Sequence, residues 1–135
     1  MRNVQKIIDT CGGMEALKQR PIRLQVPGFM RLVIEHVGRG PRGGELVSVA
    51  HYGEQNGDPM RDPEIAFEVA AGSRQPISIQ QNYVGSYREA VFIGEDGKVF
   101  VRQAEVRDIA SFARMWDRNI RAQGFVDVAK NHDGR

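Results

Sequence analysis

The side chains with the most reactive chemistry in this 135-residue chain are concentrated in one polar segment, HYGEQNGDPMRDPE, at residues 51–64. Four carboxylates in it are hard oxygen ligands of the kind that bind Mg²⁺, Mn²⁺ or Ca²⁺; they belong to Glu54, Asp58, Asp62 and Glu64. His51 could join them around a transition metal or act as a base near neutral pH. These residue types are the ones that a divalent-metal-dependent hydrolase or nuclease needs.

The spacing of these residues does not complete a known catalytic or metal-binding motif. It matches neither the calcium loop of an EF-hand nor a pair of histidines one helical turn apart. Carboxylates in a connector that contains glycine and proline are typical turn formers, and Asn56-Gly57 can adopt positive φ at low cost. We therefore predict a polar inter-strand loop of fixed shape, assign no catalytic residue and expect no cofactor. The expected binding residues of this loop are His51, Glu54, Gln55, Asn56, Asp58 and Asp62.

A second candidate surface comes from arginines near the C-terminal end. At about 100° per residue in a helix, four arginines fall within one narrow stripe: Arg107, Arg114, Arg118 and Arg121. Such a stripe could bind an acidic partner or a phosphate backbone, and phosphate binding would depend steeply on salt. The alternative is that the stripe is only a solvated helix face, whose positive charge is reduced by Asp108 and Asp117.

The elements that must position these residues follow from the period of the apolar side chains. Residues Val4, Ile7 and Ile8 share one helical face, and Gly12-Gly13 then breaks the helix. From Ile22 onward the period is two, which indicates strands separated by turn-forming residues. The glycine-rich segment 38–44 predicts a hairpin with a long flexible tip.

The end of the chain combines a hairpin with an amphipathic helix. Asp96-Gly97 between two apolar runs is a strong hairpin signal. Six residues then follow the spacing of one buried helical face, with Gly124 where a C-terminal cap belongs: Val106, Ile109, Ala110, Ala113, Trp116 and Ile120.

These elements predict an α+β fold. We expect an N-terminal helical segment, an antiparallel sheet of about five to seven mostly sequential strands, and a C-terminal amphipathic helix packed on one face. The length fits a single domain over residues 1–135, in which 125–135 are expected to form a flexible tail.

Composition narrows the classes of partner and compartment. The formal net charge of +2 is too small to indicate nucleic-acid or membrane binding by itself. Cys11 is the only cysteine, so no intrachain disulfide can form, and this fits a reducing cytoplasm. The N-terminus has no apolar run of signal-peptide length, and no window approaches the roughly 20 apolar residues of a membrane span. We expect a cytoplasmic protein with a protein partner, no membrane contact, and nucleic acid as the lesser possibility.

Several segments resemble an uncharacterised bacterial family. The segment 51–64 resembles a His-Tyr-x-Glu-Gln-Asn-Gly-Asp-x-Met-x-Asp-Pro-Glu pattern of proteins often carried on plasmids and integrative elements, whose core is similar to that of YqiB-like proteins. The flanking stretches 12–18, 30–35, 82–85 and 111–119 extend the resemblance to nearly the whole chain. Gly53 stands where an aromatic residue is expected in the YqiB-like members, and Pro59 where an aliphatic one is expected. The resemblance implies a mobile-element setting and transfers no catalytic residue.

Three functional hypotheses follow. The leading one is a non-enzymatic binding or regulatory module that acts through the loop 51–64 and the arginine stripe. The second is the divalent-metal-dependent hydrolase or nuclease that uses the loop carboxylates. The third, suggested by the mobile-element setting, is an inhibitor of a host defence complex.

Overall fold

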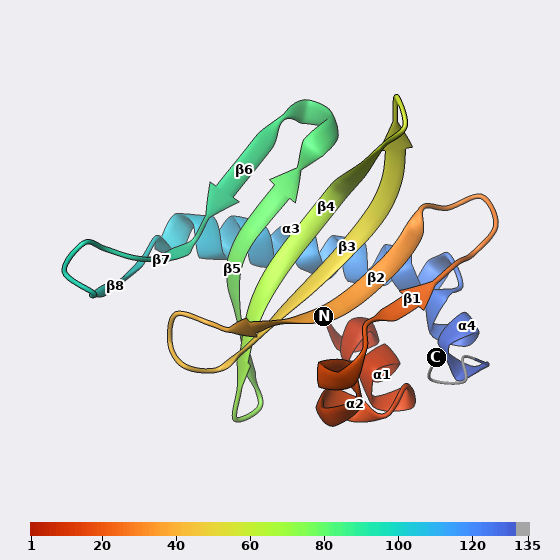
Figure 1. Ribbon diagram of the computed structural model, residues 1–135, viewed down its shortest axis with the longest axis horizontal. Coiled ribbons are helices and arrows are strands. Elements are labelled where there is room, and N and C mark those ends of the chain that lie inside the picture. The colour runs from red at the N-terminus through yellow and green to blue at the C-terminus, as the bar shows by residue number, and fades with distance from the viewer. Residues whose placement is uncertain (132–135) are drawn as a thin grey trace.

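The computed structural model describes residues 1–131, apart from the side chain of Gln55, and its centre is a six-stranded antiparallel sheet (Figure 1). Its strands lie side by side in the order in which they occur in the sequence: β1 (Ile22–Leu24), β2 (Arg31–Arg39), β3 (Glu45–Gln55), β4 (Asp58–Ala70), β5 (Ser73–Gln81) and β6 (Ser86–Glu89). A separate two-stranded hairpin is made of β7 (Val91–Ile93) and β8 (Val99–Val101). The predicted sequential antiparallel sheet is confirmed.

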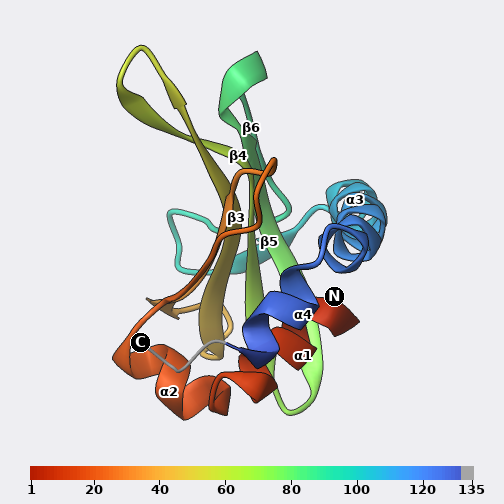
Figure 2. The ribbon, with the colours of Figure 1, turned by 90° about the vertical axis from the view of Figure 1, so that its right-hand side faces the viewer.

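The α-helices cover one face of the sheet and one of its ends, and the other face is left open (Figures 1 and 2). They are α1 (Arg2–Thr10), α2 (Gly13–Gln19), α3 (Gln103–Ala122) and α4 (Phe125–Lys130); the short 3₁₀ helix η1 (Asn82–Val84) joins β5 to β6 at the other end of the sheet. The long helix α3 lies behind the sheet in Figure 1, whereas α1, α2 and α4 pack around its lower end. The α+β architecture is therefore the predicted one. No helix within residues 1–131 has the length and apolar character needed to cross a membrane.

The core lies between α3 and the covered face of the sheet. The alternation of the strands places Ile34, Val49 and Ile65 on this face in register, and all three are buried. Helix α3 adds Ile109 and Ile120, which are fully buried, as the apolar spacing predicts. Gly124 follows this helix with φ +97°, a left-handed conformation that favours glycine and confirms the predicted helix end.

The predicted flexible tail over residues 125–135 is wrong for its first part. Residues 125–130 form α4, in which Phe125, Val126 and Ala129 are buried against the rest of the core. Burial of these apolar side chains stabilises the segment, and it depends on contacts with distant elements of the core. Residues 132–135 lie outside the described part of the chain.

The predicted flexible tip between β2 and β3 is also corrected. Glu68, a buried residue of β4, accepts hydrogen bonds from the backbone N–H of Arg42 at 3.1 Å and of Gly44 at 2.7 Å. Gly40 and Gly44 let the loop close over this carboxylate, because a Cβ at either position would lie within 3.0 Å of Glu68 atoms. A charged side chain 24 residues away therefore holds the loop.

Candidate binding site

The polar segment 51–64 is the distal half of a long β-hairpin and not a loop, so the predicted inter-strand loop shrinks to two residues. Strands β3 and β4 pair as far as Gln55 and Asp58. Only Asn56 and Gly57 lie between them, with φ +53° and +84°. Positive φ at both central residues is the signature of a type I′ turn, for which Asn-Gly is the preferred sequence. The turn signal in the sequence was correct, and the strands simply extend further than the apolar pattern indicated.

His51 is a core residue and does not join the carboxylates of the segment. Its side chain is 6% exposed and lies on the covered face of the sheet, with its ring centroid 5.4 Å from Trp116 and 5.5 Å from Phe125. Nδ1 donates a hydrogen bond to the Met30 carbonyl oxygen at 3.0 Å, since that oxygen can only accept. Burial lowers the pKa of His51 below its ordinary value, so the ring is neutral at pH 7.

The four carboxylates of the segment do not converge on one point. Glu54 pairs in register with Pro59 and Gln55 with Asp58, so the alternation of the strands places Glu54 and Asp58 on opposite faces. Asp62 accepts a hydrogen bond from the backbone N–H of Tyr83 at 2.8 Å, which fixes the start of η1. Glu64 accepts a 2.7 Å hydrogen bond from the Ser48 hydroxyl. Within residues 1–131, no three His, Cys, Asp or Glu side chains are grouped so that they could hold a metal ion.

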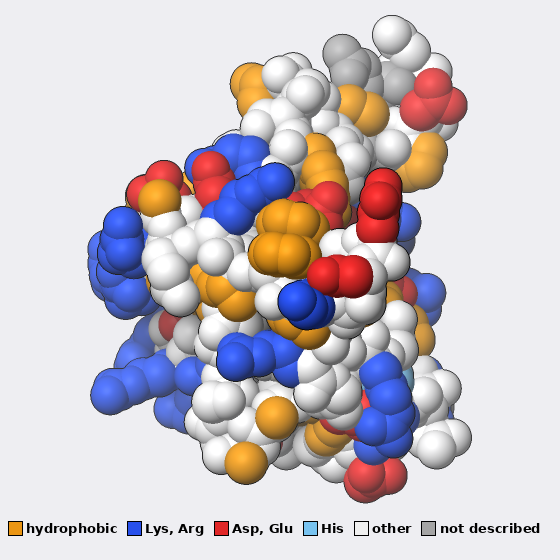
Figure 3. Space-filling view, turned by 90° about the vertical axis from the view of Figure 1, so that its left-hand side faces the viewer, with side chains coloured by type: hydrophobic (Ala, Val, Ile, Leu, Met, Phe, Trp, Pro, Cys, Tyr) orange, Lys and Arg blue, Asp and Glu red, His pale blue; other side chains and the backbone are white. Residues whose placement is uncertain are grey.

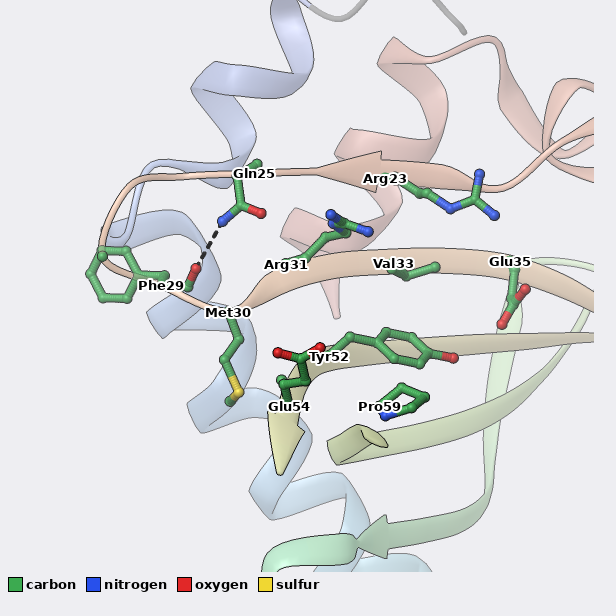
Figure 4. A pocket seen from close by; sticks show the side chains of 12 residues that line it. Arg23, Gln25, Phe29, Met30, Arg31, Val33, Glu35, Tyr52, Glu54 and Pro59 are labelled. Atoms are coloured by element: carbon green, nitrogen blue, oxygen red, sulfur yellow. Dashed lines mark hydrogen bonds between the residues drawn. The ribbon is translucent and has the colours of Figure 1, made fainter. Parts of the chain in front are cut away.

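A concavity lies on the open face of the sheet, next to the same hairpin (Figure 4). It is a groove of about 890 Å³ between the loop that joins β1 to β2 and the distal parts of β3 and β4. The segment 51–64 contributes Tyr52, Gly53, Glu54 and Pro59 to its wall. The sequence thus indicated one wall of this site, whereas the opposite wall comes from residues 23–35 and was not predicted.

That opposite wall is built by a tight turn. Phe29 N–H donates to the Val26 carbonyl oxygen at 3.1 Å, and Gly28 has φ +89°, as a Pro-Gly pair at the centre of a type II turn requires. Gln25 Nε2 donates to the Phe29 carbonyl oxygen at 3.0 Å and closes the loop (Figure 4). The turn holds Phe29 and Met30 at the mouth of the groove, where they are 43% and 38% exposed.

The groove carries charged side chains of both signs that have no ion-pair partner among the described residues. Arg23 and Arg31 lie on the β1–β2 side, opposite Val33 and Tyr52 in register. Glu35 and Glu54 lie toward different ends of the groove in Figure 4. Charged groups left without an internal partner keep their capacity to bind an external one.

Tyr52 lines the groove and remains protonated at neutral pH, because its pKa is raised. The guanidinium carbon of Arg61 lies 5.4 Å from the centre of its ring, and Arg61 is paired with Glu64 at 3.4 Å. Burial is the main cause that raises the pKa of Tyr52, Arg61 opposes this rise, and the negative charge of Glu35 adds to it. The phenol therefore offers the groove a neutral hydrogen-bond donor beside an aromatic surface.

Gly53 permits a close approach that a side chain would block. A Cβ at this position would lie 2.6 Å from Tyr83 Oη and 2.8 Å from Met30 Sδ. Tyr83 Oη also donates a 3.4 Å hydrogen bond to the Glu54 carbonyl oxygen. The resemblance led us to expect an aromatic residue at position 53. In this chain, Met30 and Tyr83 supply the apolar side chains beside the hairpin instead.

The arginines of the predicted stripe lie on the solvent-exposed side of α3. Arg107, Arg114, Arg118 and Arg121 are all exposed. In Figure 3, Lys and Arg side chains gather at the left of the view, the side on which α3 lies. Asp117, which was expected to reduce the positive charge of this stripe, is turned inward and buried. The stripe and the groove are on different sides of the molecule and do not form one site.

The remaining predicted residues are placed as follows. Asn56 and Asp58 are exposed at the tip of the hairpin, and the side chain of Gln55 lies outside the described part of the chain. The sequence did not predict the groove residues outside the segment 51–64, among them Arg23, Phe29, Met30 and Arg31. A partial signal was available, because Arg23 alternates with the apolar Ile22 and Leu24 and so belongs to the open face.

Comparison with known proteins gives a family without an assigned activity. Residues 2–126 match a family described as a domain of unknown function (DUF6908). No curated protein matches the chain, and no solved structure does. The match bears out the expected family of unknown function, whereas carriage on mobile elements and a YqiB-like core stay predictions.

Proposed function

Because the chain belongs to the family described as a domain of unknown function (DUF6908), we propose its role from surface chemistry alone: a binding module that holds an extended segment of a protein partner in the open-face groove. The polar segment 51–64 contributes to this site through Tyr52, Glu54 and Pro59. We keep the predicted role of this segment in binding, but we assign it to a different set of residues within the segment.

One observation carries the proposal: two arginines without an acidic partner among the described residues line a groove whose mouth exposes Phe29 and Met30. Tyrosine, phenylalanine, methionine and arginine are the residue types enriched in protein interfaces, whereas lysine is depleted. The groove contains all four types and no lysine. Its composition is therefore that of a protein-binding surface.

The arrangement indicates which chemistry the partner segment carries. A carboxylate would face Arg23 and Arg31, whose forked guanidinium groups bind carboxylates through paired hydrogen bonds. An apolar side chain would lie against Phe29 and Met30, and the segment's backbone could accept a hydrogen bond from the Tyr52 phenol. We therefore infer a partner segment that combines an acidic residue with a neighbouring apolar one.

A displayed random-peptide library tests this proposal. Peptides selected on the purified protein are expected to contain an acidic residue near an apolar one, and their affinity is measured by fluorescence anisotropy. The double variant Arg23→Gln/Arg31→Gln should weaken binding about tenfold or more, since each exposed charge pair contributes on the order of 1 kcal/mol. Phe29→Ser should weaken binding independently of salt.

The matched control is Arg107→Gln/Arg118→Gln, which removes the same charge from α3 and should leave peptide affinity unchanged. All four arginines are exposed, so the variants should fold alike. Selected peptides that bind the groove and control variants equally would refute the groove as the site. A library that yields no enriched peptide would refute it as well.

A further inference from the structure

The arginine stripe of α3 has no role in the groove and presents an unusual arrangement of charge. Arg114 and Arg118 are four residues apart, and Arg118 and Arg121 are three apart, so neighbouring side chains of like charge meet on the helix surface. Like charges at these spacings destabilise an isolated helix. The stripe extends from Arg107 to Arg121, which spans about 21 Å at 1.5 Å per residue.

None of the four arginines has an ion-pair partner among residues 1–131. The acidic residues of α3 are used elsewhere or point away: Glu105 pairs with Arg88 at 3.1 Å, and Asp108 lies 4.0 Å from the same arginine. Asp117 is buried and accepts hydrogen bonds from the backbone of α1. Within residues 1–131, no acidic side chain therefore forms an ion pair with the stripe.

The positive surface continues beyond the helix. Arg74 at the start of β5 and Arg114 line the same shallow depression, together with Met1. Burial is the main cause that lowers the pKa of the N-terminal amine of Met1; Arg74 and Arg114 lower it further, and Asp117 opposes them. The charges of the two arginines thus act on the same place, and the surface spans both α3 and the adjacent end of the sheet.

The surroundings of the stripe distinguish between possible partners. Met115 is the only large hydrophobic side chain of α3 that is exposed, and it lies to one side of the stripe. A protein partner would require an apolar centre to the interface, and single-stranded nucleic acid would require aromatic side chains on which bases stack. A duplex requires neither of these, because its regularly spaced phosphates are bound by basic side chains alone.

We propose that the stripe of Arg107, Arg114, Arg118 and Arg121, extended by Arg74, binds the phosphate backbone of double-stranded DNA without reading its sequence. Duplex DNA carries one negative charge per roughly 1.7 Å, so a length that matches the stripe presents about twelve phosphates. Arginine binds phosphate in a forked geometry that lysine does not provide. This surface is separate from the peptide groove and adds a second class of partner.

The test measures the affinity of the full chain for a fluorescent 20-base-pair duplex by anisotropy between 50 and 300 mM NaCl. The logarithm of affinity should fall with the logarithm of salt concentration with a slope of about −3.6 to −4.5, since four to five arginines each contact one phosphate at about 0.9 per contact. Arg114→Gln/Arg118→Gln should reduce the slope by about 2 and weaken binding at 50 mM NaCl at least tenfold.

Two control variants remove the same charge from other places. Arg20→Gln/Arg39→Gln and the groove variant Arg23→Gln/Arg31→Gln should leave both affinity and slope unchanged. The groove variant also separates this proposal from the peptide-binding one, because each proposal can fail while the other holds. Circular dichroism of all variants should show unchanged helix content, which checks that α3 is intact.

Three results would overturn the inference. The first is no detectable binding to the duplex at 50 mM NaCl. The second is an equal loss of affinity in the control variants, which would show a general effect of net charge. The third is equal or tighter binding, with the same dependence on the stripe, of single-stranded DNA or of a polyglutamate peptide.

Discussion

At the scale of single residues, His51 shows how its neighbours decide what a titratable side chain does. In the sequence it begins the most polar segment of the chain, and its residue type suits a base or a metal ligand. In the structure it lies between Trp116 and Phe125 and donates to the Met30 carbonyl oxygen. A neutral imidazole suits this position, whereas a protonated one would bring an unpaired charge into the core.

The burial of His51 predicts a loss of stability in mild acid. Its pKa is lowered in the folded protein, so the unfolded chain binds a proton first as pH falls below about 6.5. The stabilising contribution is complete above that pH and decreases below it, by at most about 1.4 kcal/mol per pH unit. Urea unfolding at pH 7.5 and 5.5 should show this loss, and His51→Phe should reduce it. An equal loss in both proteins would contradict the prediction.

At the scale of elements, two buried carboxylates accept hydrogen bonds from backbone N–H groups that have no acceptor within their own segment. Helix α1 has no side-chain cap of its own. Asp117 of α3 caps it instead, because its carboxylate accepts hydrogen bonds from the backbone N–H of Asn3 at 3.0 Å and of Val4 at 3.1 Å. Glu68 does the same for the loop between β2 and β3. In both cases a carboxylate distant in sequence satisfies backbone donors and orders the segment.

Removing the Asp117 carboxylate should detach the start of α1 from α3. Asp117→Ala leaves two backbone N–H groups without their acceptor and should lower the free energy of unfolding by about 2 to 3 kcal/mol. Asp117→Asn keeps one acceptor oxygen and should cost about half as much. Urea unfolding measures both, with Asp108→Ala as the exposed control on the same helix, expected to stay within about 0.5 kcal/mol. A loss in the control as large as in Asp117→Ala would contradict this account.

Neutralising Glu68 should release the loop that the sequence predicted to be flexible. Glu68→Gln replaces a charged acceptor by an amide and should speed hydrogen exchange at the amides of Arg42 and Gly44 about tenfold or more. Exchange in β3 and β4 away from the loop should change little. Glu15→Gln, on the exposed surface of α2, provides the control. Unchanged exchange at Arg42 and Gly44 would show that the carboxylate does not hold the loop.

At the scale of the whole molecule, one packed layer joins the helices to the sheet. Trp116, the only tryptophan, is buried between α3 and the sheet and lies against His51 of β3. Its fluorescence therefore reports the packing of the two layers, whereas circular dichroism reports the helices. Because the layers share one core, both signals should give the same urea midpoint. Two separate midpoints would show that α3 and the sheet unfold independently.

The two proposed surfaces lie on different sides of this layer. The groove opens on the uncovered face of the sheet, and the stripe follows the solvent side of α3. Two independent surfaces would let one chain bring a peptide segment and a duplex together. This arrangement is what a small adaptor requires, and the charge-matched variants test each surface separately.

The sequence by itself determined the elements whose signals are local. The period of two, the Asp96-Gly97 turn and the apolar face of α3 were sufficient to predict an antiparallel sheet covered by a helix. These signals are local because backbone conformation and the burial of one face depend on residues a few positions apart.

Only the tertiary structure decided which polar residues meet. Arg23 and Pro59 line one groove although 36 positions separate them, and a register shift between Ala50 and Tyr52 sets the side chains that share its face. His51, Glu68 and Asp117 became core residues for the same reason. The position of a polar side chain depends on partners supplied by distant elements, and no local pattern of residues encodes those contacts.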